Sequence, residues 1–523
     1  MRCLTKKIFV AASLLISALL AACGTMDPKP LADDEQLQIS ELLKQVYQQQ
    51  PAVHNTLSLS EAIARALKYN LNTRLQEANS ALASGQLTLA KWQTLPALNF
   101  TYDAYHRDNA EQQQLVGSNG QLTTNTSSVT PQTIRTQVAG LNWNILNFGV
   151  SYLSAKQQAN KVLISLEEQR KIEQQLVGDV IVSYIKAYGA QENYTQMQNT
   201  MSKANKALTN SSTALKLQLA PTQQQLRYQQ SVLQNLRRLS QLKSTLSQAK
   251  YDLAALTNLP ARTNYKLINP NFKLPPLYDS AEEAKKVDLV AIVNRPEIRQ
   301  SSYQLRNAII ALTQAKLNIL PGVTVNYAYN YTSNYYYVNQ KWMSLDVQAA
   351  WNLIQLLSGP SQTLMARSQI EVARIQNLAL TVGVLTQIRL SYLQYQGGLE
   401  DYRYAQNLAD VDDKLYKYAK KLKSADVGSE NTLIESAVES LNANLEKNLA
   451  EAAVFDAYRK MYQSVGISLV TIPQQTDDLE TSAKLIQKSL DKNLQEGFAS
   501  RIDQEYAIIE ADENSNSKPK TER

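Results

Sequence analysis

Few side chains in this sequence are of the types that carry out covalent, redox or metal chemistry. The chain of 523 residues has two cysteines and two histidines, at Cys3, Cys23, His54 and His106. Two cysteines cannot build a disulfide framework, and so few sulfur and imidazole ligands do not make a zinc cluster. The sequence contains no phosphate-binding loop, and no motif points to a nucleophile with its base. We therefore predict a protein that is not an enzyme, with no catalytic residue, no cofactor and no metal site.

One cysteine stands where a covalent modification is expected. Residues 1–22 have a short basic start and an apolar run that ends in small residues, which is typical of a secretory signal peptide. The sequence Leu20-Ala-Ala-Cys23 resembles a bacterial lipobox, and this resemblance implies cleavage before Cys23 and acylation, by palmitate for example, of its sulfur and new amine. An ordinary signal peptide followed by an accidental cysteine is the alternative. Acyl chains would anchor the segment 23–56 to lipid with about 0.8 kcal/mol per buried CH₂.

The bulk composition excludes several classes of protein. A formal net charge of +7 with no basic run is too small an excess to indicate nucleic-acid binding. Glycine and proline number 16 and 15, about half of what ordinary soluble usage would give in a chain of this length. We therefore expect few turns and long secondary-structure elements, because these two residues are among the commonest in turns. Sandwiches, propellers and doubly wound enzymes are therefore unlikely architectures.

Much of the chain consists of two segments with similar sequence patterns. Three pairs of segments correspond at offsets of 225, 208 and 208 residues: Leu95-Pro96 with Leu320-Pro321, Trp143-Asn144 with Trp351-Asn352, and Ala220-Pro221 with Gly428-Ser429. The offset drops by 17 within residues 107–133, which are rich in Gln, Asn, Ser and Thr. A longer polar loop in the first copy accounts for this drop, and the frame then recovers. The sequence therefore predicts two internal repeats.

Each repeat contains a predicted pair of strands. Apolar and polar residues alternate over 98–104, 139–145, 323–332 and 344–352, which is typical of strands with one apolar and one polar face. The edge of a soluble sheet is one interpretation, but the strands also approach the about 9–11 residues that cross a bilayer. Six aromatic residues lie near the strand ends, as in the aromatic girdles of a membrane barrel: Trp143, Trp351, Tyr335, Tyr336, Tyr337 and Trp342.

Each repeat also contains long predicted helices. The outgoing helices cover about 150–218 and 361–426, and at 1.5 Å per residue each would reach roughly 100 Å. Returning helices are predicted over 222–258 and 429–465. They are shorter, and the segments 72–95 and 296–320, which lead into the strands, can complete their length. We predict that each repeat has a pair of strands at one end of a long helical shaft.

Several motifs resemble the TolC family of outer-membrane efflux and secretion channels. The run Leu57-Ser-Leu-Ser-Glu-Ala-Ile-Ala-Arg-Ala-Leu-Lys-Tyr-Asn70 is similar to the family's opening helix. Arg295-Pro-Glu-Ile-Arg299, followed by Ala315–Pro321, is similar to the opening of its second repeat, and Trp143–Gly149 resembles its strand-to-helix junction. The resemblance extends over most of the chain, from residue 57 to 470.

The resemblance implies an α+β membrane protein in which three protomers share one barrel. Each protomer would contribute four transmembrane strands to a barrel of twelve, and coiled-coil hairpins to a long α-helical barrel. A physical argument agrees, because four strands alone cannot close a barrel and lipid does not tolerate open sheet edges. The implied function is that of a passive exit duct across the periplasm and outer membrane of a Gram-negative bacterium. Its partners would be a periplasmic adaptor and an inner-membrane transporter.

The resemblance also places the functional residues at the helix tips. The turns at Ala220-Pro221 and Gly428-Ser429 would form the periplasmic tips where an adaptor docks. An acidic ring that narrows the pore is carried over to Glu435 and Glu439, although the family has a run of Asp there and this segment is one residue short. Solvated charges on a helix face are the alternative for this pair. Asp103 and Asp346, on the polar strand faces, would point into the barrel lumen and hydrate it.

The predicted organisation has six parts. They are a signal peptide (1–22), a lipidated segment (23–56), the first repeat (57–259), a linker (260–290), the second repeat (291–470) and a C-terminal segment with a polar tail (471–523). We predict small-molecule efflux, with type I protein secretion as the second candidate. A lipid-anchored structural coiled coil or an adaptor is a weaker alternative, because an adaptor would show one helical hairpin flanked by Gly-rich β-modules.

Overall fold

A computed structural model describes residues 41–42, 50–53, 55–109, 111–116, 120–217, 221–260, 263–270, 281–473 and 478–516. The predicted signal peptide, Cys23 and Ala220 lie outside these residues. The chain divides into two units, Met1–Ala52 and Val53–Arg523, and every element described below belongs to the second. None of the helices in the described part of the chain combines the length and apolar composition needed to span a bilayer.

Four strands form one antiparallel sheet in the order β2-β5-β7-β8, so the two predicted strand pairs are joined through β5 and β7. Their bounds are β2 (Ala97–His106), β5 (Thr133–Asn144), β7 (Gly322–Thr332) and β8 (Lys341–Ala350). Strands β2 and β8 are the edges, and each has one side without a partner strand in the described residues. Two smaller sheets pair β3 (Glu111–Val116) with β4 (Leu122–Thr130), and β1 (Thr56–Leu57) with β6 (Lys266–Leu267).

The register of the sheet separates an apolar face from a polar face. Two rows of paired residues on the apolar face are Leu98–Leu141–Tyr327–Leu345 and Phe100–Ala139–Tyr329–Met343. These side chains are not covered by the chain itself, since Leu98 is 81 % exposed and Leu345 is 68 % exposed. The polar face is joined by side-chain hydrogen bonds from Asn144 to Thr324 (2.9 Å) and from Asn330 to Ser344 (2.8 Å). The predicted alternation is therefore observed on all four strands.

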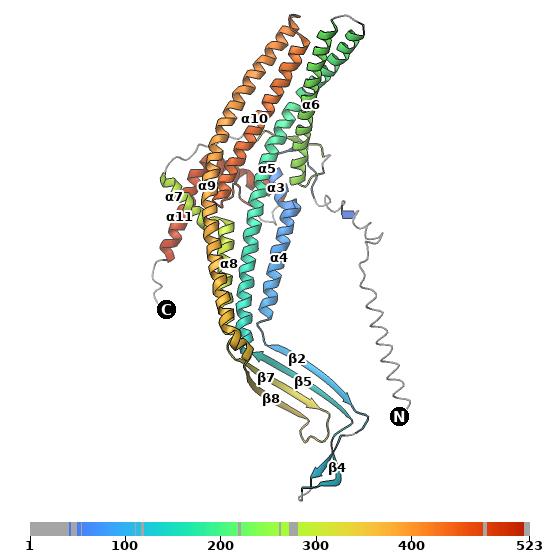
Figure 1. The fold of residues 1–523 in the computed structure, drawn as a ribbon, viewed down its shortest axis with the longest axis vertical. Helices are drawn as coiled ribbons and strands as arrows, with labels where there is room; N and C mark the ends of the chain where they lie inside the picture. The colour runs from blue at the N-terminus through green and yellow to red at the C-terminus, as the bar shows by residue number, and fades with distance from the viewer. Residues whose placement is uncertain are drawn as a thin grey trace, which may run out of the picture. The chain divides into compact units, whose positions relative to one another are not determined.

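Long helices connect this sheet to two hairpin tips at the opposite end of the unit (Figure 1). Elements of the two halves match in length: α4 (Leu71–Trp92) and α8 (Pro296–Leu317) have 22 residues, α5 (Ile145–Lys216) and α9 (Leu353–Ser424) have 72, and α6 (Thr222–Leu256) and α10 (Glu430–Ser464) have 35. Shorter helices α3 (Leu59–Tyr69) and α7 (Ala281–Asn294) precede α4 and α8, and α11 (Leu479–Asn516) follows α10. Helix α7 begins inside the segment predicted as a linker.

The outgoing helices begin earlier than the sequence predicts. Asn144 and Asn352 cap α5 and α9, and each side-chain amide oxygen accepts a backbone N–H from the first turn, that of Asn147 and that of Ile354. Such a cap satisfies an orphan donor and sets the helix start directly after the strand. Ile145 was predicted in a strand and is instead the first residue of α5. The start predicted near 361 is also wrong, since Pro360 lies inside α9.

Two apolar clusters hold the helices together. The larger one lies midway along the shaft and contains the predicted seams, with Tyr184, Ile388 and Tyr395 fully buried. The Tyr184 hydroxyl lies 2.8 Å from the carbonyl oxygens of both Leu57 and Ile268, either of which can accept its proton, and so ties the β1–β6 ribbon to α5. The smaller cluster joins α5, α6 and α10 toward the tips. Both clusters run along the helix axes, so the unit is stabilised as layers of side chains in a bundle rather than by one central core.

Candidate functional site

The described residues at the two tips make different backbone hydrogen bonds. Pro221 is the residue before α6, and its carbonyl accepts the N–H of Gln225 at 3.1 Å. In the second tip, the N–H groups of Val427 and Gly428 both donate to the carbonyl of Leu422 at 3.1 Å, so the turn closes back on the end of α9. A Cβ at Gly428 would lie 3.0 Å from the Leu422 side chain, which favours glycine there. The next residue, Ser429, caps α10.

Beyond the second tip, α10 exposes a narrow acidic stripe. Glu435 and Glu439 are exposed, whereas the residues beside them, such as Ile434 and Val438, are buried. Glu446, two turns further along, is exposed in line with them. Glu446 was not predicted as part of this stripe, although its spacing of seven from Glu439 is the helical signal for one face. None of the three carboxylates forms an ion pair with another described residue, so the stripe presents free negative charge along α10.

The helix that corresponds to α10 in the first half carries the opposite charge. At an offset of 208, Arg227 corresponds to Glu435, Arg238 to Glu446 and Lys243 to Glu451. The whole first hairpin from residue 193 to 251 contains no Asp or Glu. The two hairpins are therefore alike in length and opposite in charge, so the shared geometry does not dictate these residues.

Glu451 lies where α10 enters the apolar middle of the shaft. Burial raises the pKa of its carboxyl, and nearby Lys447 opposes the rise. Because the folded-state pKa lies above the unfolded one, the ionised group opposes folding at neutral pH, and this penalty decreases as the pH falls below the folded pKa and is gone below the unfolded pKa. Glu451→Gln should therefore raise the unfolding temperature at neutral pH, with a smaller gain at acidic pH.

Circular dichroism melts of the Gln variant at several pH values check this expectation. The matched control is Glu446→Gln on the same helix, where the side chain is exposed and little change is expected. A loss of stability in the Glu451 variant at neutral pH would show that the carboxylate makes a favourable interaction instead.

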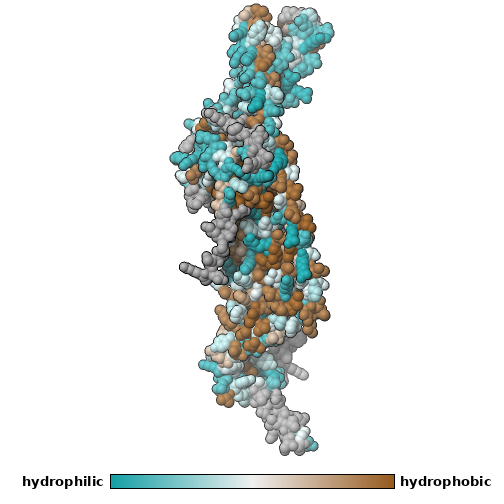
Figure 2. Space-filling view, turned by 90° about the vertical axis from the view of Figure 1, so that its left-hand side faces the viewer, coloured by the Kyte–Doolittle hydropathy of each residue, from teal (hydrophilic) through white to brown (hydrophobic). Residues whose placement is uncertain are grey.

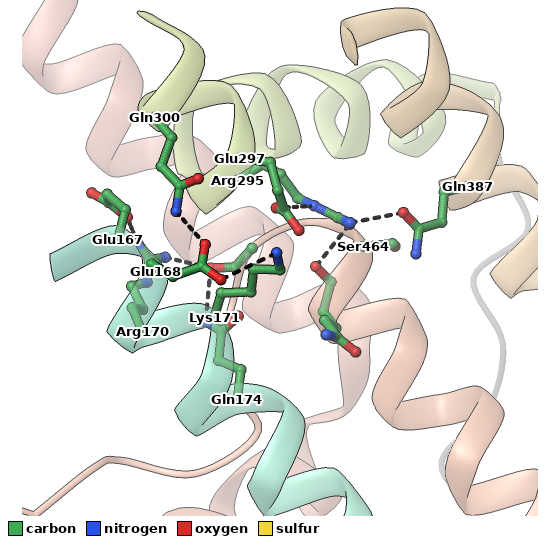
Figure 3. Close-up of polar contacts among 12 residues, drawn as sticks. Glu167, Glu168, Arg170, Lys171, Gln174, Arg295, Glu297, Gln300, Gln387 and Ser464 are labelled. Carbon is green, nitrogen blue, oxygen red and sulfur yellow. Dashed lines mark hydrogen bonds and ion pairs between the residues drawn. The ribbon is translucent and has the colours of Figure 1, made fainter. Parts of the chain in front are cut away.

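A buried polar network fixes the point where the short helices meet end to end. Arg295, 6 % exposed, precedes α8 and donates to the Glu297 carboxylate (2.7 Å), the Gln463 carbonyl (3.0 Å) and the Gln387 side chain (2.7 Å). It thereby links α8 to α9 and α10, as Figure 3 shows. In the first half the equivalent residue is Asn70, whose amide donates to the Leu256 carbonyl at 3.1 Å and links α4 to α6. Each pair of short helices is joined by one side chain at the same place in the fold.

Helix α5 completes this network on its other side. Glu167 accepts from Arg299 at 2.6 Å and from Arg170 at 3.3 Å, and Glu168 accepts from Gln300 at 2.9 Å (Figure 3). Arg170 and Gln174 both donate to the carbonyl of Gly466. Gly466 has φ = 74°, and a Cβ there would lie 2.5 Å from the Asn294 carbonyl oxygen, so only glycine fits. The network thus holds the ends of α10 and α8 against the middle of α5.

The aromatic residues predicted as girdles lie at both ends of the sheet. Trp143 is near the end of β5, and Trp351 directly follows β8 and donates its indole N–H to the Ile319 carbonyl at 3.2 Å. At the other end, Tyr335, Tyr336 and Tyr337 lie in the β7–β8 connection. Trp342 stacks on Tyr337, with ring centroids 6.2 Å apart, but its position in the pleat is that of the polar face. Asp346 lies on this polar face, as predicted, and accepts from Asn326 at 3.4 Å.

No group of His, Cys, Asp and Glu side chains in the described ranges is arranged to hold a metal ion. The described residues form a two-faced sheet with two unpaired edges, a helical shaft and two hairpin tips. Such an arrangement can line and support a passage.

Comparisons with known proteins agree at the level of the fold. No model of a protein family matches this sequence, and no curated protein matches it. Similar solved structures include the CmeC outer membrane channel of Campylobacter jejuni, with a TM-score of 0.61 and 14 % identity, covering 83 % of this chain and 90 % of that one. The outer-membrane channel OprN gives 0.60 and 14 %, over 78 % and 89 % of the two chains. The open state of the Neisseria gonorrhoeae MtrE outer membrane channel gives 0.59 and 14 %, over 78 % and 89 %. The chain therefore has the fold of these outer-membrane channels.

Proposed function

We propose that this chain is a TolC-family channel of the outer membrane, three copies of which form one passive exit duct. The observation that carries the proposal is the four-stranded sheet, with an exposed apolar face, a hydrogen-bonded polar face and two free edges. The apolar face suits lipid and the polar face suits a water-filled lumen. The likeness in fold to solved outer-membrane channels supports the same conclusion.

The sheet edges favour closure by other copies. Every neighbouring pair in the order β2-β5-β7-β8 is antiparallel, so β8 of one copy and β2 of the next would also meet antiparallel. Lipid supplies no hydrogen bonds for free backbone groups, so the sheet must be closed. About eight strands are the smallest membrane barrel, and three copies would give twelve. The two internal repeats would then each supply two strands to every third of the barrel.

The helices support the same assembly. Helix α9 exposes an apolar series at helical spacing that no described element covers: Val372, Ile375, Leu378, Val382, Leu390 and Leu393, each more than half exposed. Figure 2, which faces the side of Figure 1 on which α9, α7 and α11 lie, shows apolar residues gathered over its middle and lower part. At the opposite edge α4 exposes Leu75, Leu82 and Leu89, seven residues apart. Copies packed edge to edge would bury both series in a coiled-coil seam.

In this duct, Glu435 and Glu439, extended by Glu446, would line the pore near the second tip, and both tip turns would dock a periplasmic adaptor. An inner-membrane transporter would supply the cargo, and acylated Cys23 would add an anchor in outer-membrane lipid. We infer small-molecule efflux rather than type I protein secretion as the role, because the lipobox-like Leu20–Cys23 is more common among family members that serve efflux.

A charge placed on either face of β2 tests the proposal. Phe100→Arg, on the apolar face near the middle of β2, should prevent trimer assembly in membranes, because an arginine facing lipid near the middle of the bilayer costs about 2–4 kcal/mol per copy. The adjacent Asn99→Arg, on the polar face, should leave assembly intact. Heat-modifiable migration of unboiled samples and single-channel conductance in planar bilayers measure the result. A wild-type protein that stays monomeric and does not conduct would overturn the proposed function.

A further inference from the structure

Four lysines gather on one exposed face where α9 approaches its tip. Lys414, Lys417, Lys420 and Lys421 are all exposed, and residues 414 to 425 contain no Asp or Glu. We call these four the lysine face. None of them forms an ion pair with another described residue, although Asp410 and Asp413 lie one turn before Lys414 and Lys417. Asp413 is held instead by Ser440 and Asn444 of α10.

Apolar side chains run alongside the lysine face. Val411, Leu415 and Tyr418 are 51 %, 51 % and 62 % exposed, and they follow one another at spacings of four and three residues. An exposed apolar strip with that spacing can bind the apolar face of an amphipathic helix. Cations along its margin select a helix that carries carboxylates beside its apolar residues.

The fold itself does not require these charges. At an offset of 208, the first-half residues equivalent to the lysine face are Lys206, Thr209, Ser212 and Thr213. Three of the four positions are therefore neutral on a helix of the same length. Charges present at four positions of one helix and at one equivalent position of the other point to recognition rather than to folding.

A second copy of the chain does not supply the missing negative charge. In the proposed ring, the edge of α6 from the next copy lies beside α9, and residues 222 to 251 of α6 contain no acid and five cations, Arg227, Arg237, Arg238, Lys243 and Lys250. Both walls of the groove between copies are then positive near the tips. Neither wall then offers carboxylates to the lysine face, so the face is left available to a different protein.

We propose that the lysine face and its apolar strip bind an acidic amphipathic helix of the periplasmic partner. This inference rests on the proposed function and adds the chemistry of the partner. The Leu415 and Tyr418 side chains would pack against the apolar seam of that helix. The lysines would pair with its flanking carboxylates and accelerate its docking.

Binding of two synthetic helices to the full chain in lipid nanodiscs tests the proposal. Both are three-heptad amphipathic peptides with leucine seams, and they carry either Glu or Gln at the flanking positions. We expect the Glu peptide to bind more tightly, with an affinity that falls as salt rises. The triple variant Lys414→Gln, Lys417→Gln and Lys421→Gln should weaken Glu-peptide binding about tenfold, as three surface ion pairs would.

The matched control removes three lysines on α11, at Lys484, Lys488 and Lys492, and should leave binding unchanged. Equal binding of the two peptides, or full binding by the triple variant, would overturn the proposal. So would a triple variant that loses affinity only for phosphatidylglycerol vesicles, because the lysines would then serve lipid. Conductance of each variant in planar bilayers is read separately: a conducting channel that ignores the Glu peptide refutes the docking surface and leaves the duct in place.

Discussion

Replacing Glu435, Glu439 and Glu446 together by lysine is expected to reverse the ion preference of the channel from cations to anions. These three carboxylates lie on the exposed face of α10, whereas most of the residues next to Glu435 and Glu439 are buried. Three copies would bring nine carboxylates, in three rings, to about 16 Å of the pore length, and rings of charged side chains set the selectivity of water-filled pores. We expect the cation-to-anion permeability ratio to change at least about fivefold, or ~1 kcal/mol, the energy of one unit-charge interaction in water.

Reversal potentials in a KCl gradient across planar bilayers measure this ratio. The control variant makes the same charge change on α11, at the exposed Glu480, Glu496 and Glu510, and should keep the wild-type preference. A lysine variant that conducts normally with an unchanged ratio would place the acidic stripe outside the conducting path. In that case the stripe would be a solvated helix face.

Arg295→Ala is expected to be the most destabilising single substitution in the shaft. Arg295 is buried and makes three hydrogen bonds that join α8, α9 and α10. Its loss leaves the Glu297 carboxylate and two polar groups without this donor, and removing one partner of a buried ion pair costs about 3–5 kcal/mol. The unfolding transition followed by circular dichroism in detergent should shift to a clearly lower temperature or urea concentration.

The fold supplies its own control for this experiment. Asn70 occupies the equivalent place in the first half, but it is neutral and donates one hydrogen bond to the end of α6. Loss of a neutral cap costs about 1 kcal/mol, so Asn70→Ala should shift the transition much less. Equal shifts for the two variants would mean that the junction is stabilised by packing and not by the buried charge.

The order of the elements was predictable because it follows from local spacing. The offset of 225 separates Leu71 from Pro296 at the starts of α4 and α8, and the offset of 208 separates Ile145 from Leu353 at the starts of α5 and α9. Strand alternation and helical seams depend on neighbours within a few residues, and a single sequence displays both. The two starts that were wrong involve capping by Asn144 and Asn352, which the pattern of apolar residues does not report.

The junction could not be predicted, because its contacts join residues that are distant in sequence. Arg295 donates to Gln463, 168 residues away, and Arg170 reaches Gly466, 296 residues away. No periodicity relates such pairs, and the sequence shows only an arginine before a proline. The four lysines of the lysine face are spread among apolar residues in the sequence, and their exposure and lack of ion pairs depend on which face of α9 is covered by α10. Both properties depend on how the helices pack, which the sequence does not display.

The equal lengths of the two hairpins bear on the number of partner molecules that one channel can bind. Helices α5 and α9 start from the same end of one sheet and have 72 residues each, so their tips end at one level (Figure 1). A ring of three such chains would offer six binding sites of the same shape around its periplasmic end. The acid-free hairpin would border three of them, and the hairpin with the acidic stripe would border the other three. A partner that recognises shape alone would bind with a stoichiometry of six to three. A partner that recognises charge would bind three to three, and weighing the assembled complex would tell which property it uses.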